Sequence, residues 1–182
     1  MILFISEQQL KELSPISLNL DPKYITEHLK YSHEDVYKIL GYNLYTKIET
    51  DIAAGTLTGV YQTLMEKYIF PVLIYSTLVN ALPHIHIKLN NQGVNKSNTD
   101  YLSTATIEEV EYIRNNFEKR LSTYIEKLQT HLQYNSTTYP ELTTTTTGEQ
   151  STPDLNNNLY SFPLYLGNSW DGKEDPTTNC ED

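Results

Sequence analysis

Two histidines separated by one residue, His84 and His86, are the side chains whose spacing most suggests metal binding. The alternation of polar and apolar residues over 84–89 predicts a strand, which would place both imidazoles on one face, where zinc or copper could bind. A third ligand would have to come from elsewhere, for example from Asp100, and nothing local supplies it. We therefore interpret the two histidines as ordinary strand residues and expect neither a metal nor a cofactor.

Other patterns that carry chemistry are missing from the sequence. No glutamate is followed by a histidine three positions later, as di-iron helical bundles require. No Gly-x-Ser-x-Gly nucleophile motif occurs, and the single cysteine, Cys180, can form neither an internal disulfide nor a Cys-based zinc site. Carboxylate pairs such as Glu108 and Glu109 fall in first helical turns, where the helix dipole favours them. We expect the protein not to be an enzyme.

Charge and composition divide the chain near residue 135. The 182 residues carry a net charge of −10; residues 1–134 hold 15 acidic and 12 basic residues, whereas the remainder holds eight acidic residues and one lysine. An acidic tail disfavours nucleic acid and anionic lipid and favours a basic protein surface. With no signal peptide and no apolar run near the roughly 20 residues of a membrane span, we expect a soluble protein made in a reducing cytoplasm.

The elements that must position any site are helices, and most of them carry a start or stop signal. These signals are Ser6-Glu7-Gln8-Gln9, Asp21-Pro22, Ser32-His33-Glu34-Asp35, Gly41, Gly55 and Thr106-Ile107-Glu108-Glu109. Capping boxes and an Asp-Pro pair predict helix starts, and glycines predict helix ends. The cap-like run that follows Tyr31 predicts a break or bend near that residue.

Two further helices and a hairpin complete the predicted body, residues 1–134. The most apolar helix, 58–82, is expected to be central and kinked at Pro71. A long final helix has an apolar seam at Ile107, Val110, Ile113, Phe117, Leu121, Tyr124, Leu128 and Leu132. Between these helices, residues 84–98 predict a projecting hairpin. The predicted fold class is mainly α: a small helical bundle with a projecting β-hairpin and a long extended C-terminal tail.

Residues 135–182 predict a Thr-rich, acidic tail that is ordered by partners, because it is too polar to fold alone yet carries one aromatic segment. Amphipathic aromatic side chains without a core to join are typical of protein interfaces. The predicted interface residues are Tyr160, Phe162, Leu164, Tyr165, Leu166 and Trp170 in the tail, and Ile85, Ile87 and Val94 in the hairpin.

Several segments together resemble the head–tail connector (adaptor or ring) proteins of tailed bacteriophages, particularly of crAss-like phages. They are Phe4-Ile5-Ser6, Leu40-Gly41-Tyr42-Asn43-Leu44-Tyr45, Tyr68-Ile69-Phe70-Pro71-Val72-Leu73, Asn91-Gln92-Gly93-Val94 and the helix ending at Tyr134-Asn135. The resemblance covers roughly residues 3–140 and consists mostly of an order of elements. The Thr-rich tail goes beyond the family pattern.

This resemblance implies a structural virion protein without catalytic activity. It implies a homo-oligomeric ring in the phage neck, commonly a dodecamer, that joins the portal to further neck and tail proteins and surrounds genomic DNA without sequence-specific binding. The protein would be made in the bacterial host cytoplasm and would not contact a membrane. Two alternatives remain: a non-catalytic cytoplasmic adaptor or inhibitor that wraps a basic partner with its acidic tail, and a metal-dependent enzyme that uses His84 and His86.

Overall fold

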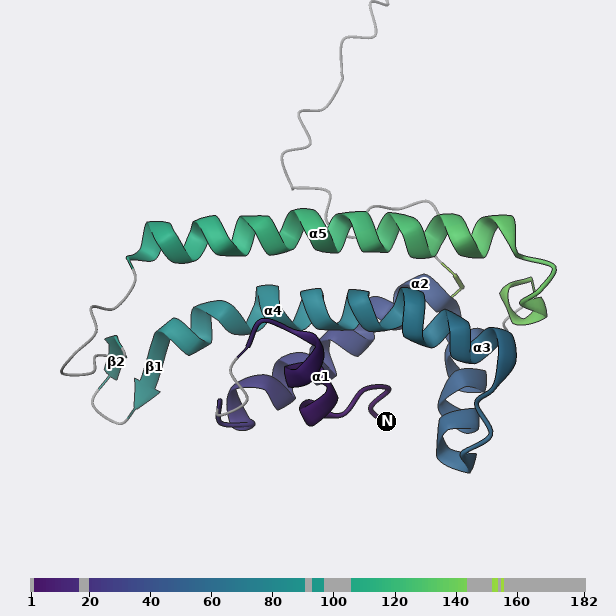
Figure 1. The fold of residues 1–182 in the computed structure, drawn as a ribbon, viewed down its shortest axis with the longest axis horizontal. Helices are drawn as coiled ribbons and strands as arrows, with labels where there is room; N and C mark the ends of the chain where they lie inside the picture. Colours follow the sequence, from purple (N-terminus) through teal and green to yellow (C-terminus); the bar gives the residue numbers. More distant parts are fainter. Residues whose placement is uncertain are drawn as a thin grey trace, which may run out of the picture.

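The computed structural model describes residues 2–16, 20–90, 93–96, 106–143, 152–153 and 155. Three long helices dominate the fold (Figure 1). In chain order the elements are α1 (Glu7–Leu13), α2 (Lys23–Ala54), α3 (Gly59–Leu64), η1 (Met65–Ile69), α4 (Phe70–His86), β1 (Ile87–Asn90), β2 (Gly93–Lys96), α5 (Ile107–Tyr134) and η2 (Pro140–Leu142).

Helix α4 is the centre of the bundle, as its apolar composition predicts. It packs against α2 on one side and against α5 on the other, and α5 runs antiparallel along it (Figure 1). The core lies between these three helices, and the short helix α1 adds Leu10 to it. Since each long helix presents an apolar stripe to its neighbour, hydrophobic burial holds the bundle together.

Gly41 and Gly55 both interrupt or end a helical segment of α2, as predicted. Gly55 ends the helix in the left-handed conformation, with φ 67° and ψ 23°. Gly41 interrupts α2 with φ 71° and ψ 169°, a backbone region that is essentially restricted to glycine, and so divides the helix into two halves. The backbone nitrogen of Pro153 would lie only 2.6 Å from a Cβ at residue 41. The glycine therefore provides both the bend and the space in which the C-terminal chain packs.

The predicted bend near Tyr31 is wrong, because α2 is helical through this region. Ser32 and His33 are fully buried within the helix and do not cap its end. Their polar groups bond to carbonyl groups one turn earlier in the same helix, Ser32 Oγ to His28 at 2.8 Å and His33 Nδ1 to Leu29 at 2.8 Å. This polar segment resembles a helix cap in the sequence, but it lies inside a helix, where its side chains bond to the backbone of the preceding turn.

Pro71 follows a π-turn. Over Met65–Ile69 the helix widens, and the N–H of Phe70 bonds to the carbonyl of Met65, five residues earlier. A proline in a regular α-helix lacks an N–H and its ring clashes with the preceding turn. A wider turn just before Pro71 relieves that conflict, so that α3, η1 and α4 follow one another without an intervening loop.

The predicted hairpin over 84–98, and with it the β part of the predicted fold class, is wrong. Helix α4 continues through Pro83 to His86, so the first residues assigned to the hairpin are helical and Ile85 is half-buried in α4. Beyond α4 only two four-residue segments pair, from Ile87 opposite Lys96 to Asn90 opposite Gly93. A short alternating run cannot by itself distinguish a strand from the end of a buried helix. The described part of the chain is mainly helical, and the projecting β-hairpin predicted over 84–98 is not supported.

One helix in the described part of the chain, Gly59–Ile85, is long and apolar enough to cross a membrane by length and composition alone. The sequence had predicted no such segment. Half of its most apolar stretch is buried inside the bundle, and the core helix of a soluble protein passes the same test. This helix is therefore weak evidence for a membrane span.

Part of the segment assigned to the tail packs on the body. Tyr139 is only 2% exposed, and Leu155 packs against the core. Gln133 Nε2 donates a hydrogen bond to the carbonyl of Leu155 at 2.7 Å, which fixes the chain beside the last turn of α5. The C-terminal segment 156–182 therefore follows a point that is held against the bundle.

Candidate functional site

The structure separates the predicted interface residues into two groups. Those in the tail lie outside the described residues: Tyr160, Phe162, Leu164, Tyr165, Leu166 and Trp170. Of the other three, Ile85 lies in α4, Ile87 begins β1 and Val94 lies in β2, paired with Leu89. Ile85 is therefore a helical residue and does not belong to a hairpin.

His84 and His86 both belong to α4, so the strand that was predicted to align them does not form at these positions. His84 instead lies beside His28 of α2, with ring centroids 4.7 Å apart. Burial lowers the pKa of His28, and the charge of His84 lowers it further. Among the described residues no group of three histidine, cysteine or carboxylate side chains could hold a metal ion.

Two pairs of polar side chains join α2 to α4 inside the core. Ser32 Oγ and Thr77 Oγ1 lie 3.0 Å apart, and Ser76 Oγ donates to Asp35 Oδ2 at 2.9 Å. Lys38 Nζ lies 3.8 Å from the other oxygen of Asp35. Because buried polar groups are costly unless paired, these contacts set the register of α2 against α4. We assign them a structural role.

The N-terminal segment is fixed to α2 by a buried histidine. The N–H of Phe4 donates to His33 Nε2 at 3.0 Å, so Nε2 carries no proton and the opposite nitrogen donates to the Leu29 carbonyl. Burial lowers the pKa of His33, which favours this neutral form. The ring of Phe4 packs on His33 and on Tyr45, at centroid distances of 5.1 and 4.7 Å.

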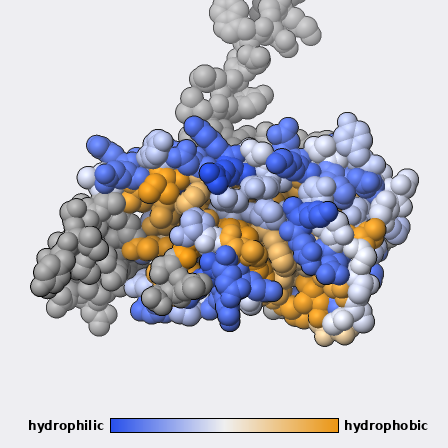
Figure 2. Space-filling view, in the orientation of Figure 1, coloured by the Kyte–Doolittle hydropathy of each residue, from blue (hydrophilic) through white to orange (hydrophobic). Residues whose placement is uncertain are grey.

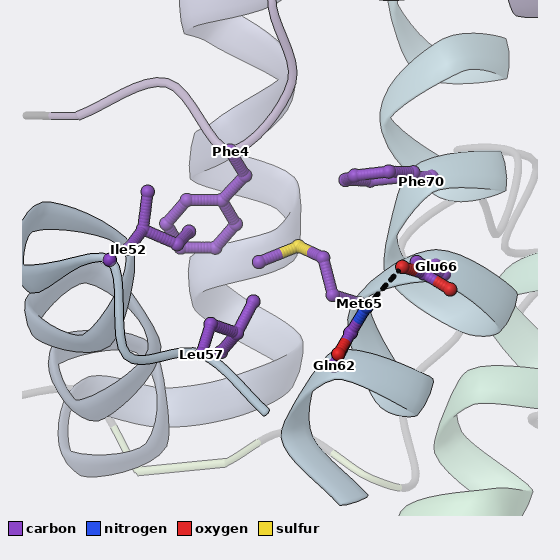
Figure 3. Close-up of a pocket in the computed structure, with 8 residues that line it drawn as sticks. Phe4, Ile52, Leu57, Gln62, Met65, Glu66 and Phe70 are labelled. Carbon is purple, nitrogen blue, oxygen red and sulfur yellow. Dashed lines mark hydrogen bonds between the residues drawn. The ribbon is translucent and has the colours of Figure 1, made fainter. Parts of the chain in front are cut away.

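The fixed Phe4 ring forms one wall of a pocket of about 300 Å³ (Figure 3). Ile52 and Leu57 lie on the same side as Phe4, Phe70 forms the facing wall, and the Met65 thioether lies between the walls (Figure 3). At the rim, Gln62 Nε2 donates to Glu66 Oε1 at 2.8 Å. A pocket of this size, with an apolar lining and a small polar rim, lies at the lower end of the usual range of ligand pockets.

The π-turn determines which residues face this pocket. Met65 and Phe70 are joined by the bond between residues five apart, and both line the pocket with Glu66. In a regular α-helix, residues five apart do not share a face. The same turn directs Tyr68 to the other side, where its ring stacks on His131 of α5 at 4.1 Å. Such single-turn widenings are frequent at functional sites.

Tyr68 and His131 border a surface groove of about 590 Å³ along α5. Its lining residues are Tyr68, Thr123, Glu126, Lys127, Thr130, His131, Tyr134 and Asn135. His131 Nε2 lies 3.1 Å from the Tyr139 hydroxyl, and Asn135 Nδ2 lies 3.2 Å from His131 Nδ1. Burial lowers the pKa of His131. Tyr134, 85% exposed, stands at the end of the groove.

The first turns of α5 expose apolar side chains. Along the predicted seam Leu121, Leu128 and Leu132 are buried, and Phe117 and Tyr124 are half-buried against the core. Ile107 and Ile113 are exposed, and the neighbouring Tyr112 is 70% exposed. Figure 2 shows α5 as a mainly hydrophilic ridge above a body with large hydrophobic areas. A helix that continues beyond the core of its own chain with exposed isoleucine and tyrosine presents a typical protein-binding surface.

A family model described as "Family of unknown function (DUF6712)" matches residues 36–152. The chain belongs to this family. No curated protein and no solved structure matches the chain.

The DUF6712 match includes most of the features above. It contains the π-turn, the Tyr68–His131 groove, all of α5 and Gly41, whereas the Phe4 and His33 contact lies before it. Sequence reasoning overlooked His131 and the groove, since Tyr68 and His131 are 63 positions apart and no local motif joins them. The one available signal was Pro71, which requires an irregular turn somewhere before it.

Proposed function

We propose that this DUF6712 protein is a non-catalytic structural protein of a virion neck. It assembles with copies of itself into a ring between portal and tail, around the DNA channel. The resemblance of residues 3–140 to head–tail connector proteins supports the proposal, and a helical bundle without a catalytic constellation in its described part is compatible with it.

The observation that carries the proposal is the surface of α5. In this helix of 28 residues the fully buried seam residues begin at Leu121 and Phe117 is half-buried, whereas Ile107, Tyr112 and Ile113 in the first turns are exposed. Burying such exposed apolar side chains against another chain stabilises the complex by about 25 cal/mol for each Å² of apolar surface removed from water. Self-association through α5 is therefore a direct use of this surface.

The C-terminal segment adds a second means of association. It carries Phe162, Leu164, Tyr165 and Trp170, which we propose to be buried against another chain of the neck. An extended segment with aromatic anchors gains affinity from its main chain and specificity from its side chains. Portal and tail-side proteins, together with neighbouring copies, are the proposed partners.

The test is the mass of the purified chain by light scattering, alone and mixed with portal and neck proteins. A large closed oligomer, or a monomer that becomes one on mixing, is expected. Replacing Phe162, Tyr165 and Trp170 with alanine should impair docking while circular dichroism of the body stays helical. A monomer that ignores the neck proteins would refute the proposal. Recovery as a one-to-one heterodimer would instead favour the cytoplasmic adaptor or inhibitor.

A further inference from the structure

We propose that His28 of α2 and His84 of α4 together bind a divalent transition-metal ion, with copper(II) bound more tightly than zinc or nickel. Among the described residues no group of three histidine, cysteine or carboxylate side chains forms a metal site, so water completes the coordination of the ion. The inference goes beyond the proposed function and is independent of it, because it requires neither a ring nor a partner protein. The separation of the two rings, the orientation of His84 and the access to the pair carry it.

The separation of the two imidazole rings fits a shared metal ion. The centroids of His28 and His84 lie 4.7 Å apart, and the ring planes are inclined by 40°. An imidazole nitrogen binds such an ion at about 2.0–2.1 Å, and the ring centroid lies about 1.1 Å behind that nitrogen. Two rings on one ion, at an angle of about 90–110°, would therefore have centroids about 4.5–5.3 Å apart. The observed distance lies at the lower end of this range, near the right angle that copper(II) and nickel(II) prefer.

A hydrogen bond orients His84 in the way that is usual for a metal ligand. Nδ1 of His84 lies 3.2 Å from the carbonyl oxygen of Asn80. A carbonyl can only accept, so Nδ1 carries the proton, and in the neutral ring the lone pair is on Nε2. Metal-bound histidines almost always donate their second nitrogen to a carbonyl, a carboxylate or water. The side chain of Asn80 is fixed in turn, because its Nδ2 donates to the carbonyl of Ser76 at 2.9 Å.

The histidine pair is accessible to an ion from solvent. His84 is exposed, and His28 is half-buried where α2 meets α4. Metal binding requires the neutral imidazole, and burial, together with the charge of His84, lowers the pKa of His28. Glu27, which is exposed, is close enough for its charge to act on His28 in the opposite direction. The same negative charge attracts a cation to the pair.

A bound ion would fix the last turn of α4 to α2. Pro83 lies inside this turn and has no N–H, so the helix lacks one backbone hydrogen bond there. His84 follows directly, and β1 begins three residues later at Ile87. An ion held by His28 and His84 would join this end of α4 to its neighbour. Because the unfolded chain does not hold the two rings together, the ion should also stabilise the folded protein.

The test is calorimetric titration of the full-length chain with copper(II) chloride, followed by electron paramagnetic resonance of the complex. We expect one ion per chain, with nitrogen couplings from two imidazoles. His28→Phe and His84→Phe keep an aromatic ring at each position but remove the ligand. Each should weaken copper binding at least about tenfold, since loss of even an outer partner of a metal ligand costs about 10–100-fold. The matched control is His86→Ala, which removes the other histidine of the last turn of α4 and should leave the affinity unchanged.

Three other outcomes would each overturn the inference. Unchanged affinity in both phenylalanine variants would identify an adventitious ion only, bound elsewhere on the chain. Loss of binding in His86→Ala but not in His28→Phe would favour the pair His84 and His86 that the sequence brings to mind. Couplings from a single imidazole in the unmodified chain would exclude a shared ion. Circular dichroism confirms that each variant is helical, and His28→Gln replaces His28→Phe if the larger ring unfolds the protein. None of these results affects the proposed function, which light scattering tests separately.

Discussion

Replacing Gly41 with alanine should destabilise the protein for two separable reasons. The backbone at residue 41 has φ 71° and ψ 169°, where a residue other than glycine costs about 1–3 kcal/mol. The added Cβ would also lie 2.6 Å from Pro153 N and 2.7 Å from Pro153 Cδ, too close for either atom to stay in place. We therefore expect a loss of about 2–4 kcal/mol in the free energy of unfolding, combining the backbone strain with part of the overpacking cost.

Gly55 provides a comparison in which an added side chain meets backbone strain but no neighbouring atom. It also has a positive φ, 67°, but a Cβ at this position would meet nothing within 4 Å. Gly55→Ala should cost about 1–2 kcal/mol, the usual penalty of the left-handed conformation. Urea unfolding of both variants, at one protein concentration, measures the difference. We assign it to the contact with Pro153 together with the costlier backbone region at residue 41, where ψ is 169° and not 23° as at residue 55.

A double-mutant cycle tests that assignment. Pro153→Ala removes Cδ and Cγ, two of the three atoms nearest the added Cβ, so it should partly rescue Gly41→Ala with a coupling free energy of about 0.5–3 kcal/mol. The reasoning would be refuted if Gly41→Ala cost no more than Gly55→Ala. It would also fail if the effects of the substitutions at 41 and 153 simply added.

Three further predictions concern single side chains. Because burial lowers the pKa of His33 below that of the unfolded chain, near 6.5, stability should be complete above that pH. The free energy of unfolding should fall as the pH drops from 6.5 through the folded pKa, by at most about 1.4 kcal/mol per pH unit. His33→Gln should flatten this dependence, measured by urea unfolding at each pH. An unchanged slope would contradict the prediction. Met65→Ala should lower the free energy of unfolding by about 2–5 kcal/mol, because Met65 is buried between the walls of the pocket in Figure 3. Met65→Leu should cost below about 1.5 kcal/mol. Equal losses in thermal or urea unfolding would argue against a packing role. Thr106→Ala removes the side chain that accepts from the N–H of Glu109 and should cost about 1 kcal/mol by thermal unfolding, while Thr106→Ser should retain most of that stability.

Local signals in the sequence predicted the ends of several helices. The capping boxes that begin at Ser6 and Thr106 both form, with the reciprocal bonds expected of them. Gly41 and Gly55 interrupt or end α2 as predicted. These features could be read from the sequence because a cap is made by residues at most a few positions apart, so its geometry depends little on the rest of the fold.

Signals that look the same locally failed where a helix was buried. The polar run after Tyr31 resembles a cap, yet Ser32 and His33 lie inside α2 and pair with groups of the same helix, α4 or the N-terminal segment. The alternation over 84–89 resembles a strand, yet α4 extends to His86. In both places the packing between α2 and α4 outweighs a weak local preference.

The sequence by itself determined the helical character of the body, several of the helix ends and the seam of α5, because periodic apolar residues and caps act through neighbours along the chain. Only the tertiary structure decided which part of that seam is covered, where the π-turn directs Met65 and Tyr68, and that Tyr68 meets His131. Those outcomes depend on how three helices cross and where each one stops. No spacing within a single helix contains that information.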